Sequence, residues 1–385
     1  RKSRRRSWRG EGTGDEKNGG ICAVSGCLPA DEAAGCGKSY EEAAGTLPAQ
    51  TEEVRTEPVE VTAAPEETTA EFVPEERIAV DGRIQSYLTG EMRDVAQADR
   101  RPLAVMISND REAWPHYGMG RAGVIYEVPV EGNMTRYMAI MEDYDDLERI
   151  GSVRSCRNCF IDFANEFDAI YAHYGQSTFA KPQLREIDDI NGIEGRGAQA
   201  FFRSSDRKAP HNAYTSFDRI QSAIVDLGYS QEYGADYEGH YQFARPGKET
   251  VLSGVETVDA VRIVPGYSMY HPEFRYSQED GLYHRYQADA PQESDEGPLA
   301  VKNVIIQYCQ SGYYANTEYL NINVDTSEWG YYATGGKAVT VTWKKEDGIT
   351  RYYGPDGEEI RLNPGKTWVC ILSTKDVDRT EFYGE

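Results

Sequence analysis

Several patterns that would assign this sequence to a large class of proteins are missing from it. Nothing approaches 18 consecutive apolar residues, so the sequence predicts no membrane-spanning helix. No GxGxxG or Walker loop is present, which leaves no nucleotide-binding fingerprint. HExxH and GxSxG motifs are also missing, so the sequence indicates neither a zinc protease helix nor the strained serine turn of an α/β-hydrolase.

Positive charge is scarce as well. The 385 residues include 41 Lys and Arg against 64 Asp and Glu, which gives a formal net charge of −23 and a pI near 4.8. We do not expect such a chain to bind nucleic acid through its overall field, although a local basic patch could still bind an anion. Hydrophobic residues make up 39%, enough for a core, and the length favours two domains and a tail.

Residues 1–77 are predicted to be a disordered segment that ends in an acidic tether. A basic head precedes Ala33-Ala34-Gly35-Cys36, the small-small-Gly-Cys pattern of a bacterial lipoprotein cleavage and acylation site. Asp31 and Glu32 interrupt the apolar run that a signal peptide needs, so the alternative is a disordered tail with incidental cysteines. Residues 40–77 are rich in Glu, Thr, Pro and Ala, which predicts an extended, self-repelling tether.

The first folded domain is predicted to span residues 78–238 and to be α/β, because strand-like and helix-like patterns intermingle along it. Short apolar runs bounded by turn residues predict strands at 102–107, 123–130, 135–141, 150–153, 168–174 and 200–203. Helical spacing predicts helices over 156–167, 178–190 and 216–227, the last with Ser216 as its N-cap.

The second domain, residues 239–385, is predicted to be mainly antiparallel β. Alternating runs separated by Gly, Pro, Asp and Asn predict strands at 258–264, 301–308, 319–324, 338–343 and 367–372. Gly335-Gly336 indicates a hairpin. The many tyrosines and tryptophans could line a glycan-binding surface, or they pack across strands within the sheet. The predicted fold class is therefore an α/β (α+β layered) N-terminal domain followed by a mainly antiparallel β C-terminal domain.

A candidate anion site lies where the strand-like residues 150–153 run into the predicted helix. Arg154, Ser155 and Arg157 stand near the helix N-terminus, where free N–H groups and the helix dipole favour a phosphate, sulfate or carboxylate. The alternative is that these arginines form structural salt bridges with Glu127, Glu131 or Asp168. Further ligand-binding residues that other segments could supply are Arg136, Arg203, Asn212 and Glu131.

A second constellation could carry acid–base chemistry. His173 ends a predicted strand and His211 lies in a loop, and with Asp168 or Glu131 they could exchange protons or hold a metal. The alternative is that each histidine is a hydrogen-bonded structural residue, since no close metal-ligand spacing occurs. Ser155 and Ser177 are candidate nucleophiles only if the fold brings a histidine to them. We assign no metal and no cofactor.

The cysteines allow a third interpretation. Cys156 and Cys159 form a C-x-x-C at the predicted helix start, where the dipole and Arg157 would lower a thiol pKa, as in a thiol–disulfide exchanger. The alternatives are a local disulfide or two small residues in the first helical turn. Cys309 and Cys370, each on a predicted strand, could pair in an exported protein.

Several long motifs resemble the YerB-like lipoprotein family, whose biochemical activity is not established. In order, they are RPLAVMISN, AGVIYEVPVEGNMTRYMAI, FDAIYAHYGQS and FFRSSDRKAPHNAYTS in the first predicted domain, then VKNVIIQ, TWKKEDGITRYY and GEEIRLNPGKTWVCIL in the second. The resemblance covers roughly residues 78–373. It implies a two-domain lipoprotein held outside the cytoplasmic membrane, with contact to the membrane only through a lipid anchor.

Residues and resemblance together predict an extracytoplasmic, membrane-anchored protein that binds through its first domain. The expected partner is a cell-envelope polymer, an anionic small molecule or another protein. A rival interpretation is an enzyme of cell-wall metabolism that uses His173, Asp168 and His211 on a phosphodiester or sugar. A weaker rival is a thiol oxidoreductase at Cys156 and Cys159. Convergence of Arg154, His173 and His211 on one pocket would favour a binding protein or an enzyme over an inert scaffold.

Overall fold

The computed structural model describes residues 77–245, 248–254 and 256–385. The predicted tail, the tether up to residue 76 and Cys36 therefore lie outside the described residues. Within the described ranges, no helix has the length and apolar composition needed to span a bilayer. The described residues form one compact unit.

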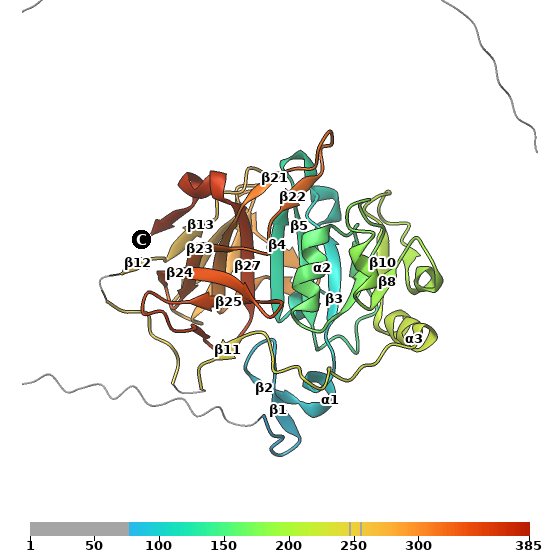
Figure 1. Ribbon diagram of the computed structural model, residues 1–385, viewed down its shortest axis with the longest axis horizontal. Coiled ribbons are helices and arrows are strands. Elements are labelled where there is room, and N and C mark those ends of the chain that lie inside the picture. The colour runs from blue at the N-terminus through green and yellow to red at the C-terminus, as the bar shows by residue number, and fades with distance from the viewer. Residues whose placement is uncertain (1–76, 246–247, 255) are drawn as a thin grey trace, which may run out of the picture. The chain divides into compact units, whose positions relative to one another are not determined.

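An eleven-stranded mixed sheet organises this unit (Figure 1). Its strands are, in spatial order, β12 (Thr257–Asp259), β24 (Lys337–Glu346), β23 (Ser327–Thr334), β20 (Asn303–Cys309), β27 (Thr367–Ser373), β4 (Val124–Pro129), β5 (Thr135–Met141), β3 (Leu103–Ser108), β7 (Ile170–His173) and β8 (Asp189–Asn191), with β25 (Ile349–Tyr353) beside β24. The pairings make β3, β4, β7, β8, β20 and β27 run in one direction. Their last residues define what we call the carboxyl edge.

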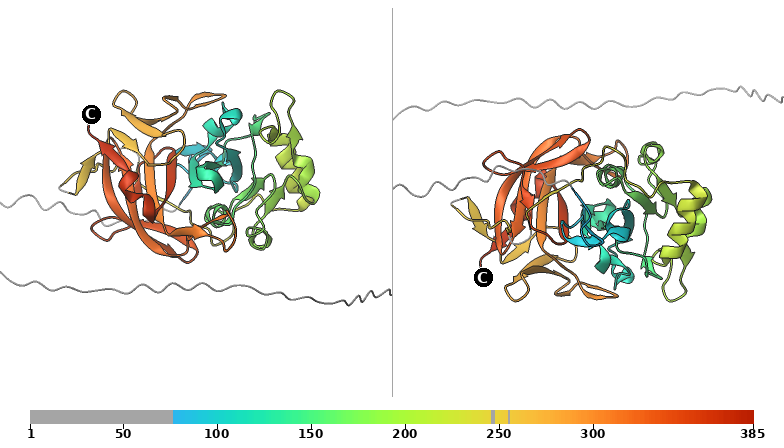
Figure 2. Two further views of the ribbon diagram at one scale, coloured as in Figure 1. Left: turned by 90° about the horizontal axis from the view of Figure 1, so that it is seen from above. Right: turned by 90° about the horizontal axis from the view of Figure 1, so that it is seen from below.

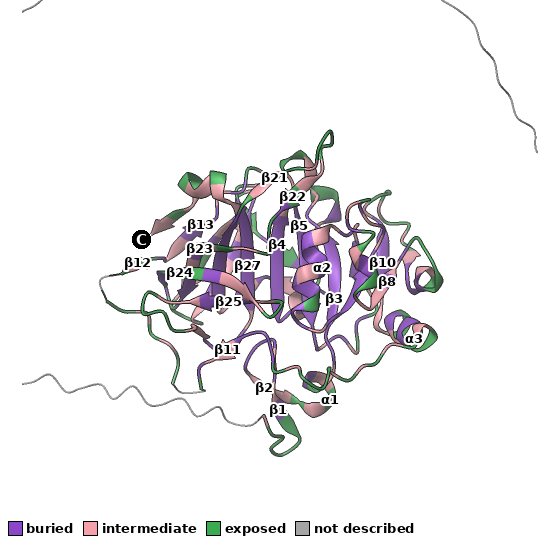
Figure 3. Cartoon of the chain, in the orientation of Figure 1, coloured by how far each residue is buried: buried purple, intermediate pink, exposed green. Residues whose placement is uncertain are grey.

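Both faces of the central strands are covered, which explains why β3 and β5 are buried along their whole length and are apolar apart from Ser108, Thr135 and Arg136. On one face, Tyr126 of β4 stacks on Phe163 of helix α2 (Asn158–Asn165), with ring centroids 4.4 Å apart. On the other face, Trp368 of β27 meets Phe274 of a second sheet at 5.5 Å. The buried residues form a continuous band through the strands and α2 (Figure 3).

The second sheet is antiparallel. It consists of β16 (Ala290–Pro291), β15 (Leu282–Gln287), β14 (Glu273–Ser277), β13 (Arg262–Val264) and β28 (Glu381–Tyr383), with β19 (Ala300–Val301) beside β15. The other described strands, in small sheets, are β1 (Arg83–Gln85), β2 (Met92–Asp94), β6 (Ile150–Gly151), β9 (Phe202–Arg203), β10 (Ala213–Thr215), β11 (Gln242–Phe243), β17 (Glu293–Ser294), β18 (Gly297–Pro298), β21 (Ser311–Tyr313), β22 (Leu320–Ile322) and β26 (Arg361–Leu362).

The predicted fold class is confirmed, because an α/β segment precedes a mainly antiparallel β segment. The hairpin at Gly335-Gly336 is present between β23 and β24, and both glycines have positive φ (61° and 78°), as a tight two-residue turn requires. Two described pairs in the second segment depart from the antiparallel pattern, since β20 pairs with β27 and β11 pairs with β26 in parallel.

Two of the three predicted helices are present, as α2 and α3 (Phe217–Leu227); the short α1 is Val95–Ala98. The helix predicted over 178–190 is wrong. That stretch contains only a 3₁₀ turn, Gln183–Arg185, followed by edge strand β8. Pro182 lacks the N–H that a helix interior needs, and Ile190 is buried where β8 pairs with β7. The pairing of β8 with β7, rather than the helical spacing of apolar residues, thus determines the conformation of this stretch.

The two predicted domains share the main sheet. β27 pairs in parallel with β4, aligning residues 367–370 with 124–127. Both views in Figure 2 show the orange-red strands of the second segment beside the blue-green strands of the first, with α3 at the far end from the C-terminus. The domain boundary predicted near residues 238 to 251 stays a prediction. Strands from both sides of this boundary lie in the same main sheet.

Candidate functional site

The carboxyl edge of the parallel strands gathers most of the predicted site residues. Asp110 follows β3, Glu131 follows β4, and Arg136 is the second residue of β5. Arg154 and Arg157 come from the segment between β6 and α2, which crosses beside them. In open sheets, ligands commonly bind where parallel strands end, since the loops after these ends provide side chains from several directions.

Three arginines lie together at this edge, and we call Arg136, Arg154 and Arg157 the arginine cluster. Arg136 is the most buried, with 8% of its surface exposed, and its Nη1 donates to the Ser155 carbonyl at 2.6 Å. Burial lowers the pKa of Arg136 to about 9, and the nearby charges of Arg157 and Arg154 act in the same direction. Holding a third positive charge here therefore costs free energy unless an anion compensates it.

Two carboxylates neutralise part of this charge. Arg157 donates hydrogen bonds to the Glu131 carboxylate from Nε, at 2.9 Å, and from Nη2, at 2.6 Å. Burial by itself would raise the pKa of Glu131, but the contacts with Arg157 hold this pKa below its usual range. Asp110 lies 3.5 Å from Arg154 Nη2. Among the described residues, no carboxylate forms an ion pair with Arg136. The salt-bridge alternative thus accounts for Arg157 and Glu131, whereas Arg136 feels the charges of Glu131 and Asp110 only at longer range.

The structure brings His211 to the cluster. Its Nδ1 lies 3.4 Å from Asp110 Oδ2, the same oxygen that faces Arg154, and Arg154 Nη1 donates to the Pro210 carbonyl at 3.3 Å. Arg154, Asp110 and His211 therefore meet. Asp110 was absent from the predicted site, although its position directly after a clear strand in RPLAVMISND was a usable signal.

His173 and Asp168 do not join this group. The His173 ring is fully buried, with Nδ1 facing the Gly175 carbonyl at 2.8 Å and Nε2 facing Asp189 at 3.0 Å, so neither nitrogen is available to a ligand. Asp168 precedes β7 whereas His173 ends it, which places them at opposite edges of the sheet. Asp168 instead accepts from the Gly234 N–H at 2.7 Å and pairs with Arg101 at 3.3 Å.

The remaining polar candidates support the neighbouring loops. Arg203 donates to Asn212 Oδ1 at 2.6 Å, and its guanidinium lies 5.0 Å from the Tyr174 ring. Asn212 in turn donates to the Ser204 carbonyl at 3.0 Å. Ser155 donates its hydroxyl to the Tyr174 carbonyl at 3.2 Å. Ser155 is thus engaged with backbone rather than with a histidine that could activate it.

The low-pKa thiol predicted at the C-x-x-C is wrong. Cys156 and Cys159 are both free and buried, and burial raises the pKa of Cys156 to about 12. Cys309 and Cys370 are also free. In the parallel register Cys370 aligns with Ile306, three residues from Cys309, and an odd offset places the two side chains on opposite faces of the sheet.

A cavity of about 330 Å³ lies at the same edge of the sheet, and none of the three arginines is part of its lining. Thr135, the neighbour of Arg136 in the chain, is part of its wall, and loops after β4, β20 and β27 supply most of the rest. Lys375 and Arg379 add positive charge, and the exposed ring of Tyr313 stands at the wall as well. In the part of the chain that the structure describes, no three His, Cys, Asp or Glu side chains gather as a metal site requires.

Comparison with known proteins identifies the family. Residues 88–230 match the N-terminal domain, and residues 261–369 the C-terminal domain, of a family described as protein of unknown function DUF3048. The chain is 29% identical over 302 residues to "Putative lipoprotein YerB" of Bacillus subtilis (strain 168), across 76% of this chain and 88% of that protein. The crystal structure of the YerB protein from Bacillus subtilis matches with a TM-score of 0.67 at 26% identity, covering 78% of this chain and 99% of that one.

The fold and the order of its two segments thus define a two-domain DUF3048 protein. The chain belongs to the YerB-like family, which confirms the resemblance carried by its sequence motifs.

Proposed function

We propose that this protein is a lipid-anchored, extracytoplasmic binding protein whose arginine cluster holds an anionic group of a cell-envelope ligand. The name of its relative, a lipoprotein, and the Ala-Ala-Gly-Cys pattern that ends at Cys36 support the anchor and the location. The observation that carries the binding role is Arg136, a buried guanidinium beside two further arginines and without a carboxylate partner in the described ranges.

An oxyanion is the ligand group that this arrangement suits. Guanidinium groups bind phosphate, sulfate or carboxylate through paired N–H donors, and a bound anion would offset the repulsion among the three cations. Asp110 and Glu131 leave the cluster with a positive surplus, so the anion need not displace either carboxylate. The cavity of about 330 Å³ at the same edge of the sheet offers room for another part of a long polymer.

Binding is favoured over catalysis by the state of the predicted acid–base groups. His173 has both ring nitrogens occupied, and Asp168 lies at the other edge of the sheet. An enzyme at this site would have to rely on His211 and Asp110 alone. Ser155 offers no activated nucleophile, since its hydroxyl is directed to a backbone carbonyl.

Thermal unfolding in sodium phosphate or sulfate, against sodium chloride at equal ionic strength, tests the proposal. A ligand at 100 times its Kd stabilises a protein by about 2.7 kcal/mol, and Arg136→Gln or Arg154→Gln should weaken the anion's Kd at least about tenfold. Arg219→Gln is the matched control, because Arg219 is exposed on α3 and its Nη1 donates to the Gln199 carbonyl rather than to the cluster. Equal stabilisation of all four proteins would refute the site.

Turnover decides between a binder and an enzyme. Titration calorimetry with a poly(glycerol phosphate) polymer gives the affinity, and mass spectrometry of the polymer afterwards reveals any cleavage or transfer. The proposal expects binding without product. Product that forms with the parent and vanishes in His211→Gln, at unchanged affinity, would replace the binding role with an enzymatic one.

A further inference from the structure

Both segments of the chain contribute to the cavity of about 330 Å³ at the carboxyl edge. The turn between β4 and β5 supplies Asn133 and Met134, and the hairpin of β21 and β22 supplies Tyr313 and Leu320. Figure 1 shows β21 and β22 beside the ends of β4 and β5. The 3₁₀ turn after β27, Thr374–Arg379, forms a further wall. This volume is at the lower end of the range for small-molecule pockets, which is about 300 to 1,000 Å³.

An exposed aromatic ring distinguishes this cavity. Tyr313 has 68% of its surface exposed, and it is the one exposed side chain among the phenylalanines, tyrosines and tryptophans of the described ranges. Its neighbour Tyr314 stacks on Phe179 with ring centroids 3.8 Å apart, whereas within the same ranges the Tyr313 ring packs against no other aromatic ring. Trp343 and Trp368, by contrast, are 0% exposed, so they belong to the packing within the sheets rather than to a glycan-binding surface.

Hydrogen-bonding groups surround the exposed ring. Asn133 is exposed, and within the described residues its side-chain amide has no hydrogen-bond partner. The exposed Lys375 ammonium donates to the Ser311 carbonyl at 3.0 Å and has further N–H groups to offer. Arg379 pairs with Asp376 at 3.1 Å, and these two side chains are 57% and 33% exposed. The rim of the cavity therefore presents both donors and acceptors to solvent, with a surplus of positive charge.

A sugar ring is the ligand group that matches this lining. A pyranose presents a face of C–H groups, which packs on an aromatic ring, and a rim of hydroxyls, which donate and accept hydrogen bonds. A fatty acyl chain would leave the polar rim without partners, and an inorganic anion would leave the Tyr313 ring uncovered. The positive charges of Lys375 and Arg379 further favour a glycan that carries anionic groups.

Two elements join this cavity to the arginine cluster. In the turn between β4 and β5, Glu131 accepts from Arg157, and Asn133 lines the cavity. These two turn residues are separated by at most about 7 Å of extended chain. In the hairpin of β21 and β22, Tyr313 lines the cavity, and the Tyr319 ring centroid lies 5.4 Å from the Arg157 guanidinium. The cavity and the cluster are thus neighbouring subsites, and a ligand that crosses the turn reaches both.

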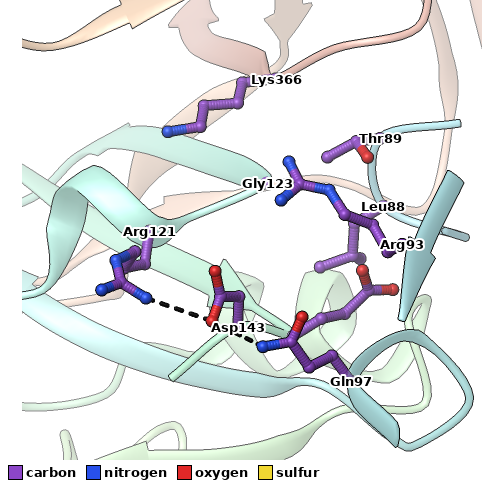
Figure 4. A pocket seen from close by; sticks show the side chains of 9 residues that line it. Leu88, Thr89, Arg93, Gln97, Arg121, Gly123, Asp143 and Lys366 are labelled. Carbon is purple, nitrogen blue, oxygen red and sulfur yellow. Dashed lines mark hydrogen bonds and ion pairs between the residues drawn. The ribbon is translucent and has the colours of Figure 1, made fainter. Parts of the chain in front are cut away.

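The opposite edge of the main sheet, where Lys366 directly precedes β27, lacks this combination. Its cavity has a volume of about 100 Å³, and among the described residues that line it none is aromatic (Figure 4). Arg121 pairs with Asp143 at 3.1 Å, and Gln97 donates to the same carboxylate at 3.0 Å. Lys366 donates to the Gly120 carbonyl. The polar side chains there mostly bind one another, so the exposed ring with its polar rim is particular to the carboxyl edge.

We propose that the cavity of about 330 Å³ is a saccharide subsite and that the envelope ligand is an anionic glycan. One sugar ring packs on Tyr313 and forms hydrogen bonds with the rim, among them one with Asn133. An anionic group of the same polymer lies at the arginine cluster. The position of the anion rests on the proposed function, whereas the sugar contact depends on the cavity alone.

Titration calorimetry of the full chain with three ligands tests this assignment. Poly(N-acetylglucosamine 1-phosphate) carries sugar rings and phosphates, poly(glycerol phosphate) carries phosphates without rings, and a neutral β-1,4-linked oligomer of N-acetylglucosamine carries rings without phosphates. A ligand that fills both subsites gains from their proximity, so we expect the first polymer to bind at least about tenfold more tightly than either of the others.

Variants locate the sugar contact. Tyr313→Ala should abolish the advantage of the sugar phosphate polymer and leave the affinity for poly(glycerol phosphate) unchanged. Tyr313→Phe keeps the ring and should keep the advantage. Tyr353→Ala is the matched control, because Tyr353 lies on β25 and is not part of the cavity wall. Tyr313 is exposed, so its truncation should change the stability of the fold little.

The outcomes separate the two subsites. Equal affinity of the parent for both phosphate polymers, or a Tyr313→Ala variant that keeps the preference for the sugar polymer, would overturn the saccharide subsite while anion binding stands. If Arg136→Gln leaves both polymer affinities unchanged and Tyr313→Ala weakens binding of the sugar polymer, the anion site fails together with the proposed function, and the sugar contact stands. Absence of binding by all three ligands would overturn both.

Discussion

Glu127 on β4 and Arg285 on β15 form an ion pair inside the protein, with Oε2 and Nη2 2.5 Å apart and both side chains 0% exposed. Thr135 and Trp368 also donate to the Glu127 carboxylate, at 2.8 and 3.3 Å. Although burial opposes it, Glu127 raises the pKa of Arg285, which keeps the guanidinium charged. The pair joins the main sheet to the second sheet, and it links the two DUF3048 segments.

Breaking this pair from one side should cost more stability than removing both charges. Arg285→Met leaves Glu127 buried without its counter-ion, and we expect a loss of about 3 to 5 kcal/mol in the free energy of unfolding. Adding Glu127→Gln removes the stranded charge while keeping an acceptor for Thr135 and Trp368. Chemical denaturation of both single variants and the double variant should give a coupling of at least about 1 kcal/mol; additive losses would contradict a strong pairing.

The stability of the protein should depend on Glu142 in a pH-dependent way. Burial raises the folded pKa of Glu142 from 4.5 to about 7, so between these values the folded state holds a proton that the unfolded state releases. Stability then falls as pH rises through this window, by up to about 3 kcal/mol. Glu142→Gln removes the penalty, and its stability relative to the parent should therefore increase from pH 5 to pH 8. Denaturation midpoints at both pH values measure this.

The matched control for that measurement is Glu148→Gln, an exposed position six residues away. Its stability relative to the parent should change little across the same pH range. A Glu142→Gln variant that loses stability equally at both pH values would mean that the Ser86 hydrogen bond outweighs the cost of burying the carboxylate.

The buried thiols should be unreactive in the folded protein. Burial raises the pKa of Cys156 and Cys309 to about 12 and holds that of Cys159 and Cys370 above the usual range. Because the thiolate is the reacting species, iodoacetamide at pH 8 should label these four cysteines at least about 100-fold more slowly than in denaturant. Peptide mass spectrometry separates them from the cysteines outside the described residues. Rapid native labelling of Cys156 would restore the thiol-exchange interpretation.

The two histidines of the first segment should differ in what they contribute to folding. His173→Gln cannot reproduce contacts to both the Gly175 carbonyl and Asp189, so we expect a loss of about 1 to 3 kcal/mol. His211→Gln should stay within about 0.5 kcal/mol of the parent, because the Nδ1 of His211 has no hydrogen bond to lose. Denaturant titrations of the parent and the two variants measure these losses in the free energy of unfolding. Similar small losses for both would show that the His173 ring is not held by its two contacts.

Local pattern predicted the central strands well. The apolar runs at 102–107, 123–130 and 135–141 became β3, β4 and β5, because strands buried on both faces are mostly apolar, with Glu127 and Arg136 as buried charged exceptions. Helical spacing of Phe160 and Phe163 likewise predicted α2, whose Phe163 packs on Tyr126. The same reasoning failed over 178–190, where the pairing of β8 with β7 decided the conformation.

The candidate site could be predicted only in part. Sequence identified Arg136, Arg154 and Arg157 as potential neighbours, since two of them flank a helix start. It could not tell that Glu131 compensates Arg157 and that Arg136 stays without a carboxylate, because those contacts depend on which strands end side by side. For the same reason His173 and His211 looked alike in sequence, although one is enclosed by backbone and Asp189 and the other faces Asp110.

The sequence by itself determined the family, the order of an α/β and a mainly antiparallel segment, and the positions of the central strands. Composition, periodicity and long motifs carry this information, and all of them are local along the chain. Only the tertiary structure decided that β27 lies against β4, that the four described cysteines are free thiols, and that Lys366 and Glu142 line one cavity. These features join residues more than a hundred positions apart or depend on strand register, and neither is encoded in any one stretch of sequence.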